Sequence, residues 1–470
     1  MDSDESGPDT ESVVSSVASG VSKISSTSST TYLTGYTPVA WWRLSFRTIV
    51  LTLLPLISLL GGYGTWSLGA SNGTFDTLIA LLGHDNPRFP GTEDPLLMQY
   101  TGLKALDRQL AVLVAFFAPV VDVKNPALNL FAIWGLGQFG AVWTLMVMES
   151  MRMGNKGKAV SFIGLVGLIM QNVTLTITAP LWLFAHLLTS PVSKPFPGAH
   201  ASSVLLVSSL DLKILPISIT LSYLLPSILM ALPSPEFFTP ETHQRLLALW
   251  QAFPLLTVLI HRIVHSTTNR LTLYFFPIDP HSRPPTPLGT SYLHNTKHIY
   301  RFVLTLCTLT HLPVLVLALF PATLLPSLSP LDPFTSSPFL TLLNQTPSTI
   351  FIPQLPFPNQ KASGLAQGVQ TFLQYDIYIA SSAFILWAVL LYRNATTEKA
   401  IVDPNTSLPI YRELLTGEKR RGGGEEGRRE WRKLGVKVVG WGMLAGPAGV
   451  VGRLLWERDS IVRLKIKQGL

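Results

Sequence analysis

Charged residues are scarce in this sequence. Aspartate, glutamate, lysine and arginine make up only 13% of the 470 residues, whereas 47% are hydrophobic. A soluble domain usually carries about 25% charged residues. The missing charge leaves a series of apolar blocks of roughly 20 residues, the length that spans a bilayer as a helix. Because the backbone must satisfy its own hydrogen bonds inside hydrocarbon, the sequence predicts an all-α, polytopic transmembrane helix bundle.

Cysteine and the usual metal- and phosphate-binding motifs are also nearly absent. Cys307 is the only cysteine, which excludes a disulfide framework within the chain and a cysteine-based metal site. The sequence contains no DxxxD, DxDD or HExxH motif, and no glycine-rich phosphate loop opens a helix. We therefore expect neither a metal ion nor another cofactor.

The formal net charge of +8 would suit a nucleic-acid ligand, but the basic residues lie beside the apolar blocks. Membrane topology produces this clustering, because lysine and arginine accumulate in cytoplasmic loops. We therefore expect the lipid bilayer, and no nucleic acid, as a partner.

The apolar blocks predict eight membrane spans. A ninth stretch, 434–456, contains Lys437 and six glycines, so we expect an interfacial or partly inserted C-terminal helix there. The eight spans are placed at 44–66, 105–121, 127–149, 159–188, 213–232, 246–265, 300–320 and 368–392.

The positions of lysine and arginine predict that both termini are cytoplasmic, in a protein of the endoplasmic reticulum. The run GEKRRGGGEEGRREWRK at 417–433 is the densest basic segment, whereas Lys361 is the only basic residue in 321–367. The first loop should therefore be cytoplasmic and the second lumenal.

One loop contradicts this topology. The segment after the third span should be lumenal, yet it carries Arg152, Lys156 and Lys158. The glycosylation sequons at Asn72 and Asn344, in contrast, fall on the lumenal side, as expected of a glycoprotein.

Composition divides the chain into four regions. Residues 1–38 are acidic and serine-rich, with too little apolar content to build a core, and we expect them to be a disordered cytoplasmic segment. Residues 39–395 hold the transmembrane bundle and 396–433 a basic cytoplasmic loop. Residues 434–470 are expected to form the amphipathic or partly inserted C-terminal helix.

Three carboxylates lie in or at the ends of apolar blocks. A charge at the bilayer centre costs roughly 2.5–3.5 kcal/mol, so such residues are functional candidates by default. Asp376 is alone in its block, Glu149 ends the third span and Asp107 begins the second. Each also has a structural interpretation: helix packing for Asp376, an ion pair with Arg152 for Glu149, and a helix-dipole contact for Asp107.

As functional groups, the three carboxylates are expected to converge on one apolar cavity. Like charges that lie close together keep a proton on one of them, and a protonated carboxyl group can act as a general acid. Glu149 and Asp107 rank above Asp376 as the initiating acid. The deeper Asp376 would then position a substrate or receive the final proton.

Other polar and aromatic residues in the blocks are candidate substrate contacts. Gln138 shares a helix face with Glu149, and Trp387 shares one with Asp376, because 11 residues return an α-helix to within about 20°. Gln171 lies in the middle of the fourth block, where an interhelical hydrogen bond would also explain it.

The basic loop after the third span supplies the last candidates. Arg152, Asn155 and Lys156 follow Glu149 directly and could bind an acidic head group at the mouth of the cavity. That role would explain positive charges that topology does not.

Several segments, in order, resemble one known family. They are GLKALDRQLAVLVAFFAPV, QFGAVWTLMVMESMRMGNKGK, IGLVGLIMQN, APLWLFAHL, LPISITLSYLLPSILMALPSP, LALWQAFPLL and TFLQYDIYIASSAFILWA, and they cover most of residues 100–392. The sequence is similar in these segments to the fungal membrane-bound terpene cyclases of ascofuranone, ascochlorin and macrophorin biosynthesis. The serine-rich start and the basic 417–433 loop depart from that pattern.

The resemblance implies cyclisation of the prenyl chain of a meroterpenoid, such as a farnesyl or epoxyfarnesyl group. In that family a carboxylic acid protonates a terminal epoxide or alkene, a carbocation closes the rings, and no metal takes part. The implied partners are a prenylated small molecule and other enzymes of the same pathway.

Two other functions fit the same residues. A small-metabolite transporter would use Asp376 and Glu149 as coupling-ion or substrate sites, although the sequence shows no internal repeat. In a non-catalytic membrane scaffold, the polar residues would only pack helices against one another.

Overall fold

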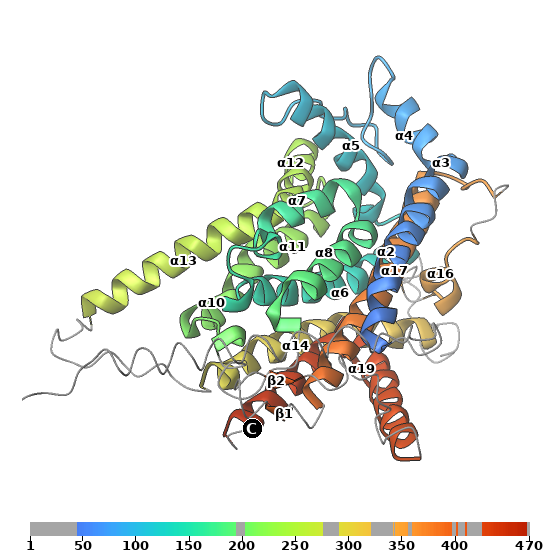
Figure 1. Cartoon of the computed structure of the whole chain (residues 1–470). Helices are drawn as coiled ribbons and strands as arrows, with labels where there is room; N and C mark the ends of the chain where they lie inside the picture. Colours follow the sequence, from blue (N-terminus) through green and yellow to red (C-terminus); the bar gives the residue numbers. More distant parts are fainter. Residues whose placement is uncertain are drawn as a thin grey trace, which may run out of the picture. The chain divides into compact units, whose positions relative to one another are not determined.

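Helices make up nearly all the regular structure in the computed structural model (Figure 1). The residues that it describes are 45–193, 203–275, 291–320, 342, 344–355, 360–396, 401–402, 409–410 and 425–467. Within them, β1 (Ile401–Val402) and β2 (Pro409–Ile410) form a two-residue antiparallel pair. The predicted all-α fold is confirmed. The predictions for 1–38 and for most of 396–433 concern residues outside the described ones.

The helices differ widely in length. The long ones are α2 (Phe46–Gly62), α5 (Lys104–Val121), α6 (Pro126–Ser150), α8 (Leu175–Thr189), α13 (Phe253–Phe275), α14 (Ser291–Leu319), α17 (Leu365–Thr396) and α19 (Glu425–Lys467). The short ones are α3 (Leu68–Ser71), α4 (Thr74–Leu82), α7 (Ile163–Val173), α10 (Ser209–Ile219), α11 (Leu225–Ala231), α12 (Pro240–Gln251) and α16 (Pro347–Phe351). Two π-helical turns, η2 (Tyr63–Ser67) and η6 (Thr220–Leu224), continue α2 into α3 and α10 into α11. Single 3₁₀ turns are η3 (Met153–Asn155), η4 (Ala159–Ser161) and η5 (Pro191–Ser193).

The described part of the chain contains six helical segments long and apolar enough to cross a membrane, or seven if α12 and α13, bent by 74°, form one span. The protein is thus a membrane protein, and its described residues hold six or seven such segments where about eight were predicted. The six segments are Phe46–Ser71, Pro126–Ser150, Ser203–Ala231, Tyr292–Leu319, Leu365–Thr396 and Gly427–Lys467.

Two predicted spans fail for identifiable reasons. The second span corresponds to α5, whose first turns carry Lys104, Asp107 and Arg108, too many charges for a membrane segment of this length. The fourth corresponds to α7 and α8, because the chain breaks at Thr174 into two helices of 11 and 15 residues. Their lengths, about 16 and 22 Å, are each too short for a hydrocarbon core of about 30 Å.

Helices α7 and α8 instead form a hairpin whose two ends lie on the same side. The Lys158 ammonium, before α7, donates to the carbonyl of Thr189 at the end of α8 (2.7 Å). About two turns back along α8, the Trp182 indole donates to the carbonyl of Val160 (3.2 Å). The break at Thr174 is therefore the tip of the hairpin.

Helix α19 also turns back on itself. Its backbone is non-helical at Gly446 (φ 70°, ψ −176°), directly before Pro447. Across this break Lys437 pairs with Glu457, and the Arg453 guanidinium lies 5.4 Å from the Trp441 ring. Because both pairs are centred on residue 447, the two halves run antiparallel and side by side. The helix is long and apolar enough to cross a membrane, but its two ends lie on the same side of the bundle.

The ends of these hairpins meet the ends of other helices on one side of the bundle. Arg47, at the start of α2, donates to the carbonyls of Leu187 and Ser193. Asn394, at the end of α17, donates to the same Ser193 carbonyl (2.9 Å), and Lys465 donates to Ala395 next to it (2.7 Å).

The loop after α6 lies on this same side, because Lys158 reaches Thr189. The basic charges of 152–158 therefore share a side with the start of α2 and the end of α17. This placement removes the contradiction in the predicted topology, which came from counting α5 as a span. The fold brings this loop and both ends of the unit 46–467 to one side.

The sequon at Asn72 lies on the opposite side, where the end of α3 meets the start of α17. The backbone N–H of Ala362 donates to the carbonyl of Asn72 (3.0 Å). Asn72 is only 3% exposed, and its Oδ1 accepts from the N–H and hydroxyl of Thr74. The folded chain leaves no room for a glycan there, whereas Asn344 is exposed.

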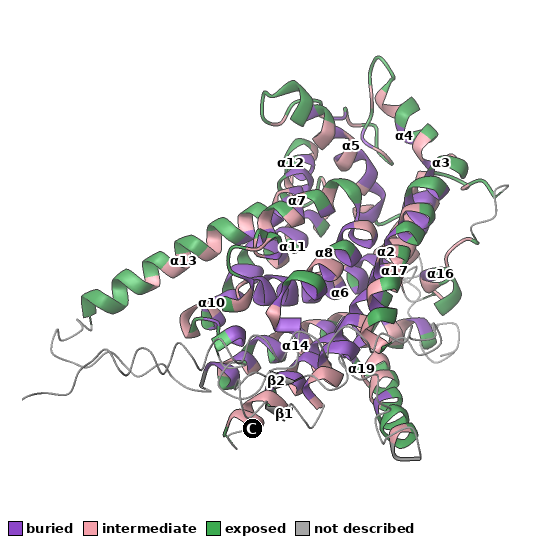
Figure 2. Cartoon of the chain, in the orientation of Figure 1, coloured by how far each residue is buried: buried purple, intermediate pink, exposed green. Residues whose placement is uncertain are grey.

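The core is centred on α6. Figure 2 shows this helix buried over most of its length, while the outer part of α13 is exposed. Helices α14, α17 and α19 pack against α6, and α8 packs between α2 and α17. Each predicted site residue therefore has to be judged by what surrounds it inside this bundle.

Candidate functional site

The Asp107 carboxylate binds the loop that precedes its own helix, α5. One carboxylate oxygen accepts from the N–H of Thr101 (2.6 Å) and of Tyr100 (3.1 Å), and the other accepts from the N–H of Gly102 (3.0 Å). Burial acts to raise the pKa of Asp107, but the hydrogen bonds from Thr101, Tyr100 and Gly102 bring the pKa below its ordinary value. The carboxylate therefore stays ionised and fixes the loop before α5.

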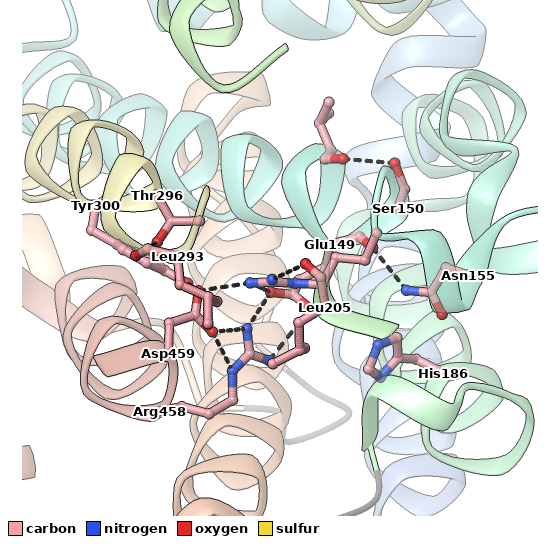
Figure 3. Close-up of polar contacts among 12 residues, drawn as sticks. Glu149, Ser150, Asn155, His186, Leu205, Leu293, Thr296, Tyr300, Arg458 and Asp459 are labelled. Carbon is pink, nitrogen blue, oxygen red and sulfur yellow. Dashed lines mark hydrogen bonds and ion pairs between the residues drawn. The ribbon is translucent and has the colours of Figure 1, made fainter. Parts of the chain in front are cut away.

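Glu149 belongs to a buried cluster of four charges (Figure 3). Its carboxylate lies 2.7 Å from the Arg458 guanidinium and 2.9 Å from that of Arg152. Asp459 pairs with the same two arginines, each at 2.8 Å, and accepts a hydrogen bond from the Tyr300 hydroxyl (2.8 Å). The four formal charges cancel, and every side chain is at most 3% exposed.

The cluster holds Glu149 as an anion, because two cations contact its carboxylate. This arrangement is the opposite of the protonated carboxyl group that a general acid requires. Glu149 was expected to rank, with Asp107, above Asp376 as the initiating acid, with a surface ion pair as the alternative. The ion pair exists, but it is buried and joins α6 to the second half of α19.

Arg152 and Asn155 are also occupied within the protein. Arg152 is fully buried and additionally donates to the carbonyl of Leu205 (2.8 Å). Burial acts to lower the pKa of Arg152, but Asp459 and Glu149 raise it above the ordinary value. Asn155 is fully buried and donates to the carbonyl of Glu149 (2.7 Å). The predicted head-group contact therefore has no support at these two residues, and of the three only Lys156 is exposed.

Gln138 stabilises the break in α19. Its amide nitrogen donates to the carbonyl of Ala445 (3.2 Å), and its amide oxygen accepts from the N–H of Ala448 (2.9 Å). A break inside a membrane protein frees backbone groups that need partners, and one amide side chain supplies both here. Gln138 is 2% exposed, so its predicted role as a substrate contact is replaced by this structural one.

Trp387 and Gln171 likewise bind other side chains. The Trp387 indole donates to Nδ1 of His186 (3.2 Å), and Gln171 donates to the side-chain oxygen of Gln251 (3.3 Å). Gln171 thereby ties α7 to the bend between α12 and α13. Interhelical hydrogen bonding, the simpler interpretation of Gln171, accounts for its position.

Asp376 has a different environment. It lies in the middle of α17, opposite the tip of the α7–α8 hairpin, and Oδ1 accepts from the N–H of Thr176 (2.8 Å). Among the described residues, no lysine, arginine or histidine forms an ion pair with it. The hydroxyl of Thr174 and the N–H of Leu175 also interact with the carboxyl group, so its described polar neighbours are uncharged. Of the three carboxylates, Asp376 alone keeps the apolar setting expected of an acid.

The hairpin tip beside Asp376 has a strained backbone. Thr174 has φ 111°, the only positive φ of a non-glycine residue in the described ranges. Such a conformation costs on the order of 1–3 kcal/mol and persists where the surrounding structure enforces it. The turn points the first N–H groups of α8 at Asp376, and the helix dipole favours an oxygen there.

Close packing against α2 holds the tip in place. Ser58 donates to the carbonyl of Ile177 (2.9 Å), and the Trp66 indole donates to the carbonyl of Val173 (2.9 Å). Between them, Gly61 contacts Thr176 so closely that a side chain at Gly61 would collide with it. These three contacts therefore fix the end of α7 and the start of α8 on either side of the break.

Aromatic rings lie on the same side of α17 as Asp376. Phe372 precedes Asp376 by one helical turn, so the two side chains lie on one face. The Phe372 ring is 5.1 Å from that of Phe116 and 6.1 Å from that of Phe75, which in turn is 5.5 Å from the Trp66 ring. Aromatic faces of this kind can stabilise a positive charge.

The three carboxylates do not share one cavity. Thr176 bonds Asp376, whereas His186, further along α8, interacts electrostatically with Glu149. The helix rises about 15 Å between these two residues. Asp107 bonds only to the loop before α5 among the described residues. The expected convergence is therefore corrected: the fold separates the carboxylates because each caps or pairs a different helix end.

Sequence reasoning missed Arg458 and Asp459, which lie in the stretch expected at the membrane interface. It also missed Thr174, because β-branched residues rarely take a positive φ and nothing in the local sequence marks the break.

Comparisons with known proteins agree with this membrane enzyme architecture. The model of the CtvD domain family matches residues 49–463. The terpene cyclase penA of Penicillium crustosum is 28% identical over 73% of this chain and 84% of its own. The terpene cyclase atmA of Aspergillus flavus is 28% identical over 83% and 91%, and the terpene cyclase ascI of Acremonium egyptiacum 28% over 77% and 79%.

No solved structure matches the chain. The family match covers most of the sequence, including every helix from α3 to α17, and the relatives match over most of their own lengths. The resemblance to fungal terpene cyclases is confirmed, and the chain belongs to the CtvD domain family.

Proposed function

We propose that the protein is a membrane-bound terpene cyclase that closes rings in the farnesyl or epoxyfarnesyl chain of a meroterpenoid, without a metal ion. Its similarity to three proteins named terpene cyclases supports the reaction class. A bundle embedded in the bilayer suits a prenyl chain, which is soluble in the same hydrocarbon.

Asp376 is the initiating acid in this proposal. The single observation that carries the assignment is its partner set: backbone N–H groups and a hydroxyl at a helix tip, and no cation among the described residues. Asp107 and Glu149 are committed to hydrogen bonds and ion pairs that favour their charged forms. A carboxyl group that stays protonated can transfer its proton to an alkene or an epoxide.

The reaction then conserves atoms and charge. The O–H bond of the Asp376 carboxyl group breaks as the proton bonds to the terminal alkene carbon or epoxide oxygen. The alkene π bond supplies the electrons for the new C–H bond, or the epoxide C–O bond breaks with its electrons going to oxygen. The resulting carbocation accepts the π electrons of the next double bond, and a ring closes. The last carbocation loses a proton, its C–H electron pair becomes a double bond, and the released proton restores the acid. Phe372, Phe116 and Phe75 would stabilise the positive charge during the cascade.

The bundle is proposed to lie in the endoplasmic reticulum membrane with residues 46 and 467 on the cytoplasmic side. The basic loop 152–158 supports this orientation, because positive residues accumulate in cytoplasmic loops. On that side the exposed Lys156 could contact the substrate head group or another enzyme of the pathway.

The test is product formation by purified protein in lipid nanodiscs, given farnesylated phenols and their terminal epoxides. A cyclase yields isomers of unchanged mass that contain new rings. A transporter or a scaffold leaves every substrate unchanged in nanodiscs. For a transporter, vesicles that contain the protein would instead take up the compound.

A further inference from the structure

Among the described residues, three threonine hydroxyl groups at the hairpin tip lie beyond hydrogen-bond distance of a partner: those of Thr174, Thr176 and Thr178. Thr174 and Thr178 are each 9% exposed, and the Thr174 hydroxyl also interacts with the Asp376 carboxyl group. Buried polar groups nearly always find a partner, so unpaired hydroxyls clustered on one turn require an explanation.

The usual partner of a helical threonine is the carbonyl four residues earlier. Thr189, at the other end of α8, bonds in this way to Ala185 (2.8 Å). Thr178 leaves its hydroxyl free instead, although Thr174 provides that carbonyl. The Thr174 carbonyl accepts from the N–H of Thr178 (3.2 Å), so both residues lie at the first turn of α8.

Three further observations concern the same place. The positive φ of Thr174 exposes the N-terminus of a 15-residue helix, which attracts oxygen atoms. Asp376 approaches that N-terminus and bonds to the N–H of Thr176. The hydroxyl of Thr176 itself is directed at Gly61 and is enclosed by α2, so Thr174 and Thr178 are the available donors.

We propose that the hydroxyls of Thr174 and Thr178 bind an oxygen atom at the reacting end of the prenyl chain and hold it against Asp376. The site would then select a chain that ends in an oxygen-bearing group over the corresponding hydrocarbon chain. A hydroxyl, an ether and an epoxide share this chemistry. The inference rests on the proposed function of Asp376 and assigns the binding step to separate residues.

The experiment compares Thr174→Val and Thr178→Val with wild-type protein in nanodiscs. Valine keeps the branched shape and removes only the hydroxyl. Substrates are one farnesylated phenol and its counterparts with a terminal hydroxyl, ether or epoxide. Wild-type kcat/KM should be highest for one of the oxygen-bearing chains, and each variant should reduce that value by about tenfold. The value for the hydrocarbon chain should fall much less, so that the preference between the two chains is lost.

Thr189→Val is the matched control, because it makes the same change on the same helix at a hydroxyl bonded within the helix. It should alter neither value. If the threonine variants keep the wild-type preference, or if wild-type protein prefers the hydrocarbon chain, the inference is wrong.

A binding measurement separates this inference from the assignment of the acid. Asp376→Asn protein is titrated with the same four compounds, and the shift in its thermal unfolding temperature is recorded. The oxygen-bearing chain should stabilise it more than the hydrocarbon, and Thr178→Val should abolish the difference. Equal shifts would overturn the inference even if Asp376 proved to be the acid. A Thr178-dependent difference would support it even if Asp376→Asn still cyclised substrate.

Discussion

The Lys437 ammonium and the Glu457 carboxylate form an ion pair across the break in α19, although 20 residues separate them in the sequence. Straight helical geometry would place them about 30 Å apart. The pair therefore shows that the helix folds back at Gly446–Pro447. Together with the α7–α8 hairpin, this gives the bundle two inserted hairpins that enter from the same side.

This fold predicts a specific topology. Single cysteines at Lys156 and Lys467, in a Cys307→Ala background, should react with a membrane-impermeant thiol reagent from the same side of sealed microsomes. A cysteine at Asp76, which follows α3, should react only from the other side. Labelling of positions 156 and 467 from opposite sides would mean that α19 crosses the membrane.

Replacing Glu149 should damage folding more than chemistry. Glu149→Gln leaves the buried Arg458 and Arg152 with one carboxylate instead of two, and breaking a buried ion pair costs about 3–5 kcal/mol. Thermal unfolding of the purified variant should show a clear loss of stability. The fraction that remains folded should keep a wild-type kcat. A stable variant with no turnover would restore Glu149 as a catalytic candidate.

Gln138 should matter for stability through the α19 break. Gln138→Leu removes the amide that bonds both the Ala445 carbonyl and the Ala448 N–H. Each backbone group left unsatisfied should lower the free energy of unfolding by about 1–3 kcal/mol. Gly446→Ala should have a similar effect, because its Cβ would lie 2.7 Å from the Gln138 oxygen at a positive φ. Denaturation curves of the two variants should shift together. An unchanged curve for Gln138→Leu would argue against this structural role.

Thr174→Gly should separate stability from activity. Glycine adopts a φ of 111° without steric cost, so the variant should be as stable as wild type or more stable, by up to about 1 kcal/mol. It also lacks the hydroxyl and loosens the tip, so product formation should fall. Unfolding temperature and kcat, measured on one preparation, provide the check. Full activity would show that the tip has no functional role.

The sequence was sufficient for the fold class, because this depends on where the apolar blocks fall. It was insufficient for the span count. The block 159–188 looks continuous, yet Thr174 breaks it through packing against α2 at Gly61, a contact between residues far apart in the sequence.

The candidate site shows the same limit. Charge in or beside apolar blocks marked Glu149, Asp107 and Asp376 as candidate functional residues. The roles of the three carboxylates differ because each contacts different groups, and those groups lie in other helices or loops. Arg458 approaches Glu149 from more than 300 positions away, so no local pattern could distinguish an anion in a cluster from an isolated acid.

The most direct test of the account is the rate of ring formation by Asp376→Asn in lipid nanodiscs, compared with wild type and with Asp107→Asn. Asparagine keeps the shape and can still accept from the N–H of Thr176, but it cannot donate an acidic proton. The account predicts that Asp376→Asn folds normally and loses activity by a factor of at least about 10², while folded Asp107→Asn stays active. Near wild-type cyclisation by Asp376→Asn would contradict the assignment of this aspartate as the initiating acid.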